Sequence, residues 1–261
     1  MRQTSLAEGI YDLWIRTDLA EEARCGQFVA VYPKDKSTLL PRPISICETD
    51  RQEGALRLVY RVAGKGTAEF SRLKAGDSVQ ILGVLGNGFP VEKAKPGMNA
   101  VLLGGGIGVP PILELAKSLS CRKQIVAGDR DGNCFLREDL QRAACADLPE
   151  TEAAKGSAFW IATEDGSVGT RGNVMDAVAQ NDLRPDILYA CGPLPMLRAV
   201  KRYAEEKEIP AYLSLEERMA CGVGACLGCV CRTVGVDAHS HVHHARICTD
   251  GPVFEAREVD I

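Results

Sequence analysis

Four cysteines near the C-terminus have a spacing that binds metal. Cys221, Cys226 and Cys229 follow the pattern C-x4-C-x2-C, and Cys248 comes nineteen residues later. This is the plant-type arrangement, in which four thiolates hold a 2Fe-2S cluster. Glycines between these cysteines suit a loop that aims backbone N–H groups at sulfur, because glycine adopts positive φ without a Cβ clash. The spacing therefore predicts Cys221, Cys226, Cys229 and Cys248 as cluster ligands.

A structural zinc site is the alternative, because four thiolates also form a tetrahedral zinc cage. Zinc ribbons usually contain two C-x2-C knuckles, whereas one half of this motif is a single cysteine, so we favour iron and sulfide. Cys231 is interpreted as a spare structural thiol. All four histidines lie between the third and fourth cysteines, at positions 239, 241, 243 and 244. We interpret them as an exposed polar loop, since four cysteines already close the site without Rieske-type histidine ligands.

A glycine-rich stretch earlier in the chain could bind a dinucleotide. Gly104, Gly105, Gly106 and Gly108 join a predicted strand to a predicted helix. Glycines let the backbone approach a diphosphate closely, and a helix N-terminus offers positive potential. The stretch is not a G-x-G-x-x-G match, because Val109 and two prolines follow it, so a standard Rossmann fold is in doubt.

Three further turns follow the other predicted strands of this region: 128–130 (GDR), 163–167 (TEDGS) and 191–193 (CGP). Ligands of open α/β sheets bind at the carboxyl ends of the strands, so these turns are expected to line one crevice. The candidate nucleotide contacts are Thr163, Asp165, Cys191, Gly192 and Pro193. Each turn could instead be only a turn, and Cys191 only a small buried residue. Asp129 and Asp165 would favour NAD over NADP by repelling a 2′-phosphate, whereas Arg130 indicates the opposite.

Two short motifs closer to the N-terminus could bind a flavin. The first is Arg42-Pro43-Ile44-Ser45, where a guanidinium and a hydroxyl could hold a pyrophosphate and a flavin ring nitrogen. The second contains Gly66 and Thr67 ahead of a helix-like stretch, and Thr67 is expected to cap that helix. Either motif alone is weak, because Arg-Pro and Gly-x-Gly pairs also form ordinary turns. Their position ahead of the glycine-rich region strengthens the prediction of an FAD site.

The elements that must position these residues fall into three zones. From residue 11 to about 92, short β-type runs separated by turn residues predict a small antiparallel barrel. From residue 99, strands alternate with helices, which predicts a parallel sheet covered by helices. The remainder lacks periodicity and needs a metal centre to supply what packing cannot. We therefore expect a β plus α/β fold with an FAD domain (1–96), an NAD domain (97–211) and a 2Fe-2S domain (212–261).

Composition narrows the functional classes. The 261 residues are 46% hydrophobic and 25% charged, with a net charge of −4, which gives no basic footprint for nucleic acid. The sequence contains neither a recognisable secretory signal nor a run long and apolar enough to cross a bilayer. Eleven cysteines then favour metal ligation and buried thiols over disulfides, and a cytoplasmic location is expected.

The order of barrel, nucleotide domain and cysteine cluster resembles the ferredoxin-reductase superfamily. Within it, the chain is most similar to the electron-transfer subunits of type B (NAD-linked) dihydroorotate dehydrogenases. Four stretches carry the resemblance: RPISI at 42–46, GGGIGVPP at 104–111, YACGPLPML at 189–197 and MACGVGACLGC at 219–229. Two departures stand out, since family members are expected to have GPLGNGF where 83–89 reads GVLGNGF, and the loop before Cys248 is long and rich in histidine.

The resemblance implies the cofactors and the partner. FAD would be held by Arg42, Pro43, Ile44, Ser45, Val59, Tyr60, Arg61, Gly66 and Thr67. A partner subunit containing FMN would oxidise dihydroorotate in pyrimidine biosynthesis, and electrons would pass through the cluster and FAD to NAD within a heterotetramer. A catalytic barrel of about 250 residues has no room in this chain, so the substrate chemistry lies in the partner. Two alternatives remain: the same module in a sulfhydrogenase or ferredoxin-linked transhydrogenase, or a zinc-stabilised binding protein without redox activity.

Overall fold

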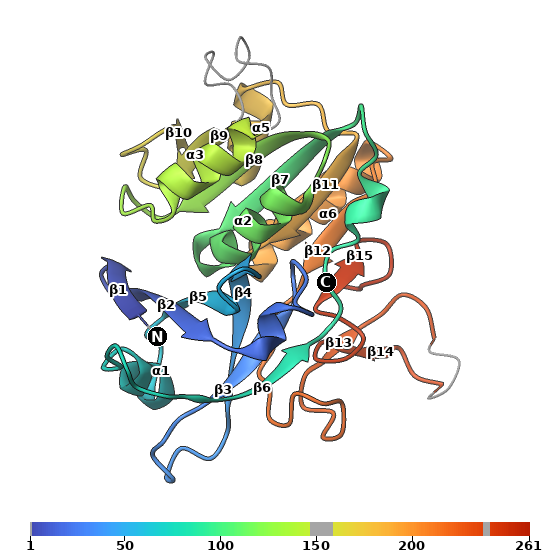
Figure 1. Ribbon diagram of the computed structural model, residues 1–261. Coiled ribbons are helices and arrows are strands. Elements are labelled where there is room, and N and C mark those ends of the chain that lie inside the picture. The colour runs from blue at the N-terminus through green and yellow to red at the C-terminus, as the bar shows by residue number, and fades with distance from the viewer. Residues whose placement is uncertain (1, 147–158, 237–240) are drawn as a thin grey trace.

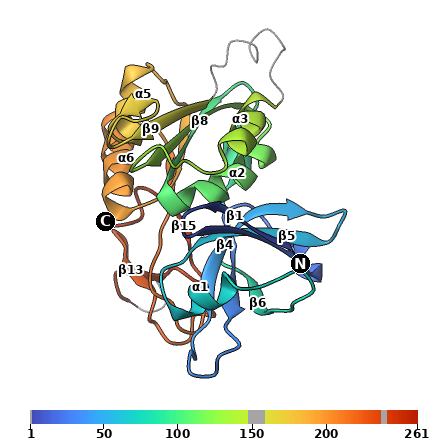
Figure 2. The ribbon, with the colours of Figure 1, turned by 90° about the vertical axis from the view of Figure 1, so that its left-hand side faces the viewer.

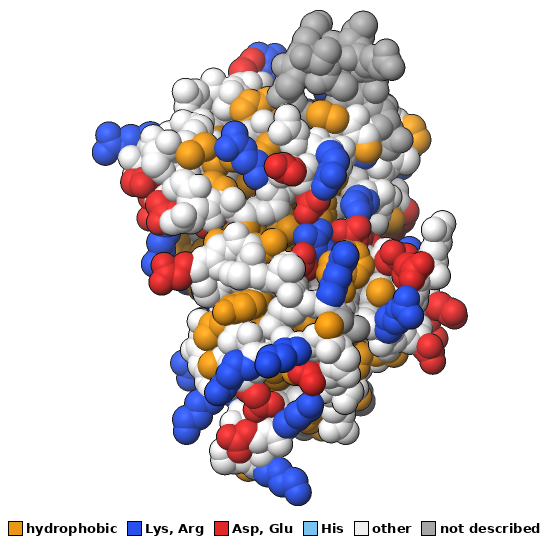
Figure 3. Space-filling view, turned by 60° about the vertical axis from the view of Figure 1, so that its left-hand side comes forward, with side chains coloured by type: hydrophobic (Ala, Val, Ile, Leu, Met, Phe, Trp, Pro, Cys, Tyr) orange, Lys and Arg blue, Asp and Glu red, His pale blue; other side chains and the backbone are white. Residues whose placement is uncertain are grey.

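The chain forms two large β-sheets, and a C-terminal segment that contains a small two-stranded sheet packs against both (Figures 1 and 2). The computed structural model describes residues 2–146, 159–236 and 241–261. In Figure 1 the helix-covered sheet lies above and the antiparallel sheet below. Figure 3 shows Lys and Arg side chains mixed with Asp and Glu on the face that it draws. No helix in these ranges combines the length and apolar character needed to span a bilayer.

The N-terminal sheet has six antiparallel strands in the order β1-β2-β5-β4-β3-β6. The strands are β1 (Arg2–Ala7), β2 (Ile10–Arg16), β3 (Phe28–Tyr32), β4 (Arg42–Asp50), β5 (Ala55–Arg61) and β6 (Gln80–Leu85). Alternate residues such as Leu13, Val29 and Leu58 point into one apolar core. The short helices α1 (Lys65–Phe70) and η1 (Asp18–Ala20) pack there through Phe70 and Ala20. Within the described ranges no ladder joins β1 to β6, so the closure of this sheet into a barrel stays a prediction.

The second sheet has seven strands in the order β10-β9-β8-β7-β11-β12-β15. They are β7 (Asn99–Gly105), β8 (Arg122–Asp129), β9 (Phe159–Thr163), β10 (Thr170–Arg171), β11 (Ile187–Cys191), β12 (Ala211–Ser214) and β15 (Val253–Glu255). All pairs are parallel except β12 with β15. Because side chains alternate along a strand, Leu102 faces α2 (Val109–Ser118) and α3 (Arg137–Cys145), whereas Leu103 faces α5 (Val174–Gln180) and α6 (Leu194–Glu206). The predicted β plus α/β fold is thus confirmed.

The C-terminal segment is built into the second sheet. Its strand β15 pairs with β12, and β12 itself crosses the predicted domain limit between residues 211 and 212. Lys201 of α6 donates through Nζ to the carbonyl oxygens of Ala256 and Val259, at 2.8 and 2.9 Å. Between β12 and β15, the strands β13 (Val230–Arg232) and β14 (His244–Arg246) form an antiparallel pair. Two short 3-10 helices lie earlier in the chain, η2 (Val91–Lys93) and η3 (Gly106–Gly108). The limits 1–96, 97–211 and 212–261 stay predictions.

One buried arginine joins the N-terminal sheet to a helix that covers the second sheet. Arg57 on β5 is 8% exposed, and it donates to both carboxylate oxygens of Asp12 on β2, at 3.0 and 2.9 Å. Its Nη1 donates to Glu48 on β4 at 3.1 Å and to Asp139 on α3 at 2.9 Å. A lysine of α2 and an arginine of α3 form further ion pairs with Glu48 and Asp139. This network fastens α2 and α3 to the N-terminal sheet.

Replacing Arg57 by methionine is expected to lower the free energy of unfolding by about 3–5 kcal/mol, because three carboxylates lose their shared partner. Arg16→Met is the matched control, since the side chains of the Arg16–Glu53 pair are 75% and 64% exposed. Its loss should stay below about 1 kcal/mol. Denaturant unfolding at neutral pH measures both, and equal losses would contradict the assignment.

The same network makes this difference depend on pH. Burial opposes the ionisation of Asp139, but hydrogen bonds from Arg57 and Arg142 outweigh it and hold the pKa of that carboxyl below its usual range. A depressed carboxyl pKa contributes stability that is fully present above the unfolded value of about 4 and is lost as pH falls through the folded value. The gap between the wild type and Arg57→Met should therefore shrink below about pH 4.

Candidate functional site

The cysteine loop aims backbone N–H groups at sulfur, as the sequence predicted. The N–H groups of Val223 and Cys226 donate to Cys221 Sγ, at 3.5 and 3.4 Å. Those of Gly224 and Gly228 donate to the sulfurs of Cys248 and Cys226, at 3.2 and 3.4 Å. Gly222 and Gly224 have φ of 72° and 79°, which brings the chain into this curl without a Cβ clash. The loop thus supplies the donors that negatively charged sulfurs need.

The four thiols are close enough to interact, and the charge of Cys221 also acts on Cys248. Cys221 contacts Cys226, and Cys229 contacts Cys248. The N–H groups of Val223 and Cys226 lower the pKa of the Cys221 thiol to about 6, whereas burial, then Cys229, raises that of Cys248 to about 11. In the part of the chain that is described, no three His, Cys, Asp or Glu side chains are arranged around one metal-ion position. Cys231, on β13 opposite Ala245, is no member of either pair.

The predicted nucleotide turns come together at the ends of β7 and β11. These strands are parallel neighbours, with Gly104 opposite Cys191. A Cβ on Gly108 would lie 2.3 Å from the carbonyl oxygen of Cys191, and a Cβ on Gly105 would lie 3.0 Å from Pro193. The two turns therefore approach each other as closely as backbones can, which only glycine permits. Cys191 is 1% exposed, and burial raises the pKa of its thiol well above the usual range.

The β8 and β9 turns occupy the same edge, but one predicted contact is turned inward. Thr163, opposite Asp129 in register, is fully buried, and its hydroxyl bonds the backbone N–H and carbonyl of Val168, at 3.1 and 2.8 Å. The Thr163 side chain thus stabilises the turn at 163–168 through its own hydrogen bonds. Asp165 is exposed and accepts hydrogen bonds from the N–H and hydroxyl of Ser167, at 2.9 and 2.7 Å, which lower the pKa of Asp165.

Arg61 of β5 approaches this edge from the other sheet. Its Nη2 lies 4.0 Å from where a Cβ of Gly106 would be. Arg61 also interacts electrostatically with Asp129. Burial raises the pKa of Asp129 to about 6, and the positive charge of Arg61 partly opposes that rise. The sequence indicates Arg61 only as a flavin contact, because its position beside the nucleotide loop depends on how the two sheets stack.

Two of the predicted flavin residues, on β4 and α1, lie against each other. The guanidinium of Arg42 lies against Gly66, where a Cβ would be 2.8 Å from its Nε, and Ile44 and Ser45 are half-buried. The expectation that Thr67 caps α1 is wrong. The N-cap is Gly64, and Thr67 Oγ1 accepts from the N–H groups of Ala63 and Gly64, at 2.9 and 3.1 Å.

Two other predicted flavin contacts have buried side chains. Tyr60 is 2% exposed, stacks on Tyr11 and contacts Gln3 through its hydroxyl at 3.0 Å. Val59 is also 2% exposed. Their side chains belong to the core, so only their backbones could touch a ligand. As flavin contacts, both stay predictions.

Gly66→Ala is expected to weaken FAD binding by about tenfold, because the new methyl would displace the charged fork of Arg42 and meet Pro33 at 3.1 Å. Gly64→Ala, two residues earlier, is the control. It has no atom within 4 Å of its Cβ position and an extended φ of −179°. Flavin content and the FAD dissociation constant are measured for both variants. Similar dissociation constants would contradict the assignment of Arg42 and Gly66 to the FAD site.

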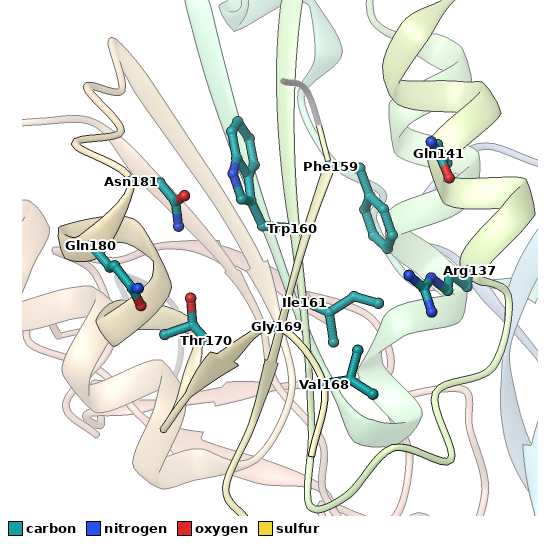
Figure 4. Close-up of a pocket in the computed structure, with 10 residues that line it drawn as sticks. All are labelled: Arg137, Gln141, Phe159, Trp160, Ile161, Val168, Gly169, Thr170, Gln180 and Asn181. Atoms are coloured by element: carbon teal, nitrogen blue, oxygen red, sulfur yellow. The ribbon is translucent and has the colours of Figure 1, made fainter. Parts of the chain in front are cut away.

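A separate hollow of about 410 Å³ lies beside β9 (Figure 4). Phe159 and Ile161 point to one side of the strand, toward Arg137 of α3, while Trp160 points to the other, toward Asn181. None of the residues predicted from the sequence as ligand contacts lines it.

Comparison with known proteins finds relatives that match the cysteine loop and nearly the whole chain. Residues 216–260 match the family described as the iron-sulfur cluster binding domain of dihydroorotate dehydrogenase B. The dihydroorotate dehydrogenase B (NAD(+)) electron transfer subunit of Bacillus caldolyticus is 45% identical, covering 98% of this chain and 95% of the relative. The protein of the same name from Listeria monocytogenes serotype 4a (strain HCC23) is 41% identical, covering 100% and 97%.

Solved structures agree on the fold. An NADH-dependent reduced ferredoxin-NADP oxidoreductase chain superposes with a TM-score of 0.81 at 29% identity, covering 100% of this chain and 88% of that one. A ferredoxin NADP+ reductase from Neisseria gonorrhoeae, with bound FAD and NADP, superposes with a TM-score of 0.61 at 16% identity, covering 79% and 88%. The second likeness concerns the fold alone.

Proposed function

The chain belongs to the family of dihydroorotate dehydrogenase B electron transfer subunits, and from this membership we propose that it passes electrons from an FMN-containing catalytic subunit to NAD. The dihydroorotate is oxidised in that partner, and the pair serves pyrimidine biosynthesis. The observation that carries the proposal is the cysteine loop, whose paired thiols and inward N–H groups lie against the sheet that bears the flavin motif.

The donor set fits a 2Fe-2S cluster. Cys221, Cys226, Cys229 and Cys248 would hold the cluster, and Cys221 interacts with Cys226 as Cys229 does with Cys248. Four N–H groups donate to the sulfurs of Cys221, Cys226 and Cys248, which suits the negatively charged thiolates that a cluster would need. Four thiolates could also hold a single zinc ion. The C-x4-C-x2-C spacing and the N–H donors to sulfur support iron and sulfide instead.

FAD and NAD fit the two remaining groups of residues. We assign Arg42, Ser45 and Gly66 to FAD, on a six-stranded sheet that acts as the flavin-binding barrel of the fold. We assign Gly104, Gly105, Gly106, Gly108, Cys191, Gly192 and Pro193 to NAD, with Asp165 at the β9 turn. When bound, the cluster carries single electrons, NAD accepts a hydride, and the flavin converts one into the other.

The residues around the cysteines offer a docking face for the catalytic subunit. Val223 and Leu227, on either side of Cys226, are 52% and 61% exposed. Large apolar side chains exposed together are typical of a surface that a partner covers. We infer that this face meets the catalytic subunit in a heterotetramer.

Co-expression with the dihydroorotate dehydrogenase catalytic subunit tests the proposed function. The two chains should co-purify, and the complex should reduce NAD+ in the presence of dihydroorotate, whereas the catalytic subunit alone should not. A colourless, zinc-containing chain would contradict the proposal. So would a chain that binds iron and flavin but transfers electrons only to or from a hydrogenase or a ferredoxin-linked flavoprotein.

A further inference from the structure

The loop after β6 holds the turn that carries the fourth cysteine. The side-chain amide of Asn87 donates to the carbonyl oxygens of Thr249 and Asp250, each at 3.0 Å. The backbone N–H of Asn87 donates to the carbonyl oxygen of Gly251 at 2.6 Å. A single asparagine therefore fastens the three residues that follow Cys248.

Internal hydrogen bonds also hold the turn at 246–251 in one conformation. Arg246 donates from its backbone N–H and Nε to Asp250 Oδ2, at 2.8 and 3.0 Å, and from Nη2 to Oδ1 at 2.9 Å. The N–H groups of Thr249, Asp250 and Gly251 all return to the carbonyl oxygen of Arg246, at 3.2, 2.8 and 3.2 Å. Because the turn is rigid, the hydrogen bonds from Asn87 to its carbonyl oxygens also fix the position of Cys248.

The same loop is continuous with the predicted flavin site. Phe28 on β3 lies opposite Ser45 of β4 on one side and opposite Leu85 of β6 on the other. Gly86 follows directly, and a Cβ there would lie 2.6 Å from Pro252 Cδ, so the close approach of loop and turn requires glycine. One row of paired residues thus runs from Ser45 through Phe28 to Leu85, two residues before Asn87.

We propose that Asn87 is a positioning residue that fastens the Cys248 turn to the row bearing Ser45, and so sets where the cluster lies relative to the flavin. The identity of the two groups rests on the proposed function, but the fastening does not. The position needs an amide rather than a carboxylate, because its partners are two carbonyl oxygens that can only accept.

Asn87→Asp tests the proposal in the holo-protein. It preserves the size of the side chain but turns a carboxylate oxygen toward two carbonyl oxygens. The matched control is Asn181→Asp at the end of α5, where the lost amide also donates to a carbonyl oxygen, that of Ala177 at 2.9 Å. Hydrogen exchange of the amides in 246–252 reports the fastening. Rapid mixing with NADH reports flavin bleaching first and the reduced-cluster signal second.

In Asn87→Asp, exchange over 246–252 should be about tenfold faster, which corresponds to a loss of about 1.4 kcal/mol when both hydrogen bonds of the amide are removed. Flavin bleaching should stay within about twofold of the wild type, while the cluster signal should appear at least about fivefold more slowly at unchanged iron content. Asn181→Asp should change none of these. Should Asn87→Asp lose iron, Asn87→Ala, which adds no charge, carries the same comparison.

Unchanged exchange would overturn the fastening, and an unchanged cluster phase beside faster exchange would overturn the positioning role. A wild-type protein without iron or flavin would instead overturn the proposed function, and the exchange experiment would still decide whether Asn87 holds the turn. The two failures are therefore distinguishable.

Discussion

Cys226→Ser is expected to remove iron and to lower dihydroorotate-dependent NAD+ reduction by about 100-fold or more, since even changes outside the ligand shell cost about 10–100-fold in metal sites. The serine hydroxyl stays protonated at neutral pH and is a poor substitute for a thiolate. Reduction of an artificial dye by NADH should survive, because that reaction needs only the flavin and nucleotide residues. Iron analysis and the two assays on the same preparation measure the split.

Cys231→Ser is the matched control for this variant. Cys231 is in the same segment, five residues further along, but it is paired with Ala245 across the β13–β14 hairpin. Its replacement should leave iron content and both activities within about twofold, as expected away from the ligand set. Equal iron loss in both variants would mean that the segment, not the ligand set, had been disrupted.

Gly108→Ala is expected to lower kcat/KM for NADH by about 100-fold, the effect of misplacing reacting groups by about an ångström. The added methyl would lie 2.3 Å from the carbonyl oxygen of Cys191 and 2.7 Å from the backbone nitrogen of Gly192. Both are backbone atoms at the end of a buried strand, so the two nucleotide turns must separate. Iron and FAD content should be retained, because neither group is assigned to these turns. Steady-state kinetics with NADH and a dye give the result.

The control for Gly108→Ala is Gly235→Ala, where no atom lies within 4 Å of the added methyl. It should match the wild type in NADH kinetics and in cofactor content. A Gly108→Ala protein with normal kinetics would show that the nucleotide binds elsewhere, whereas one lacking flavin would indicate a wider collapse.

Local patterns in the sequence were sufficient for the chemistry and for most of the fold. The cysteine loop is predictable because ligand spacing and glycine placement both act within about ten residues, and its N–H donors lie where the glycines allow. The parallel sheet is predictable because strand and helix periods alternate clearly after residue 99. The glycine turns at Gly104–Gly108 and 191–193 meet because neighbouring parallel strands end at one edge.

What could not be predicted depends on contacts distant in sequence. Arg57 looked like any polar residue on an amphipathic strand, and its partners lie on β2, β4 and α3. The ring of Tyr60 packs on Tyr11 because of the phase of β5, which no local pattern fixes, and its role as a flavin contact stays a prediction. Asn87 pairs with residues more than 160 positions away, and no local pattern indicates such a pairing. Thr67 was assigned to the wrong position of the cap, the usual uncertainty of helix ends.

Electron transfer by this chain requires a two-iron cluster and a flavin that are bound to it and exchange electrons. An anaerobic titration of the purified protein with NADH, followed by visible absorbance and by EPR on matched samples, tests this most directly. The flavin bands should bleach, and an EPR signal of a reduced 2Fe-2S cluster should grow in proportion to bound iron. A protein that bleaches without any such signal, or that contains neither iron nor flavin, would contradict the account.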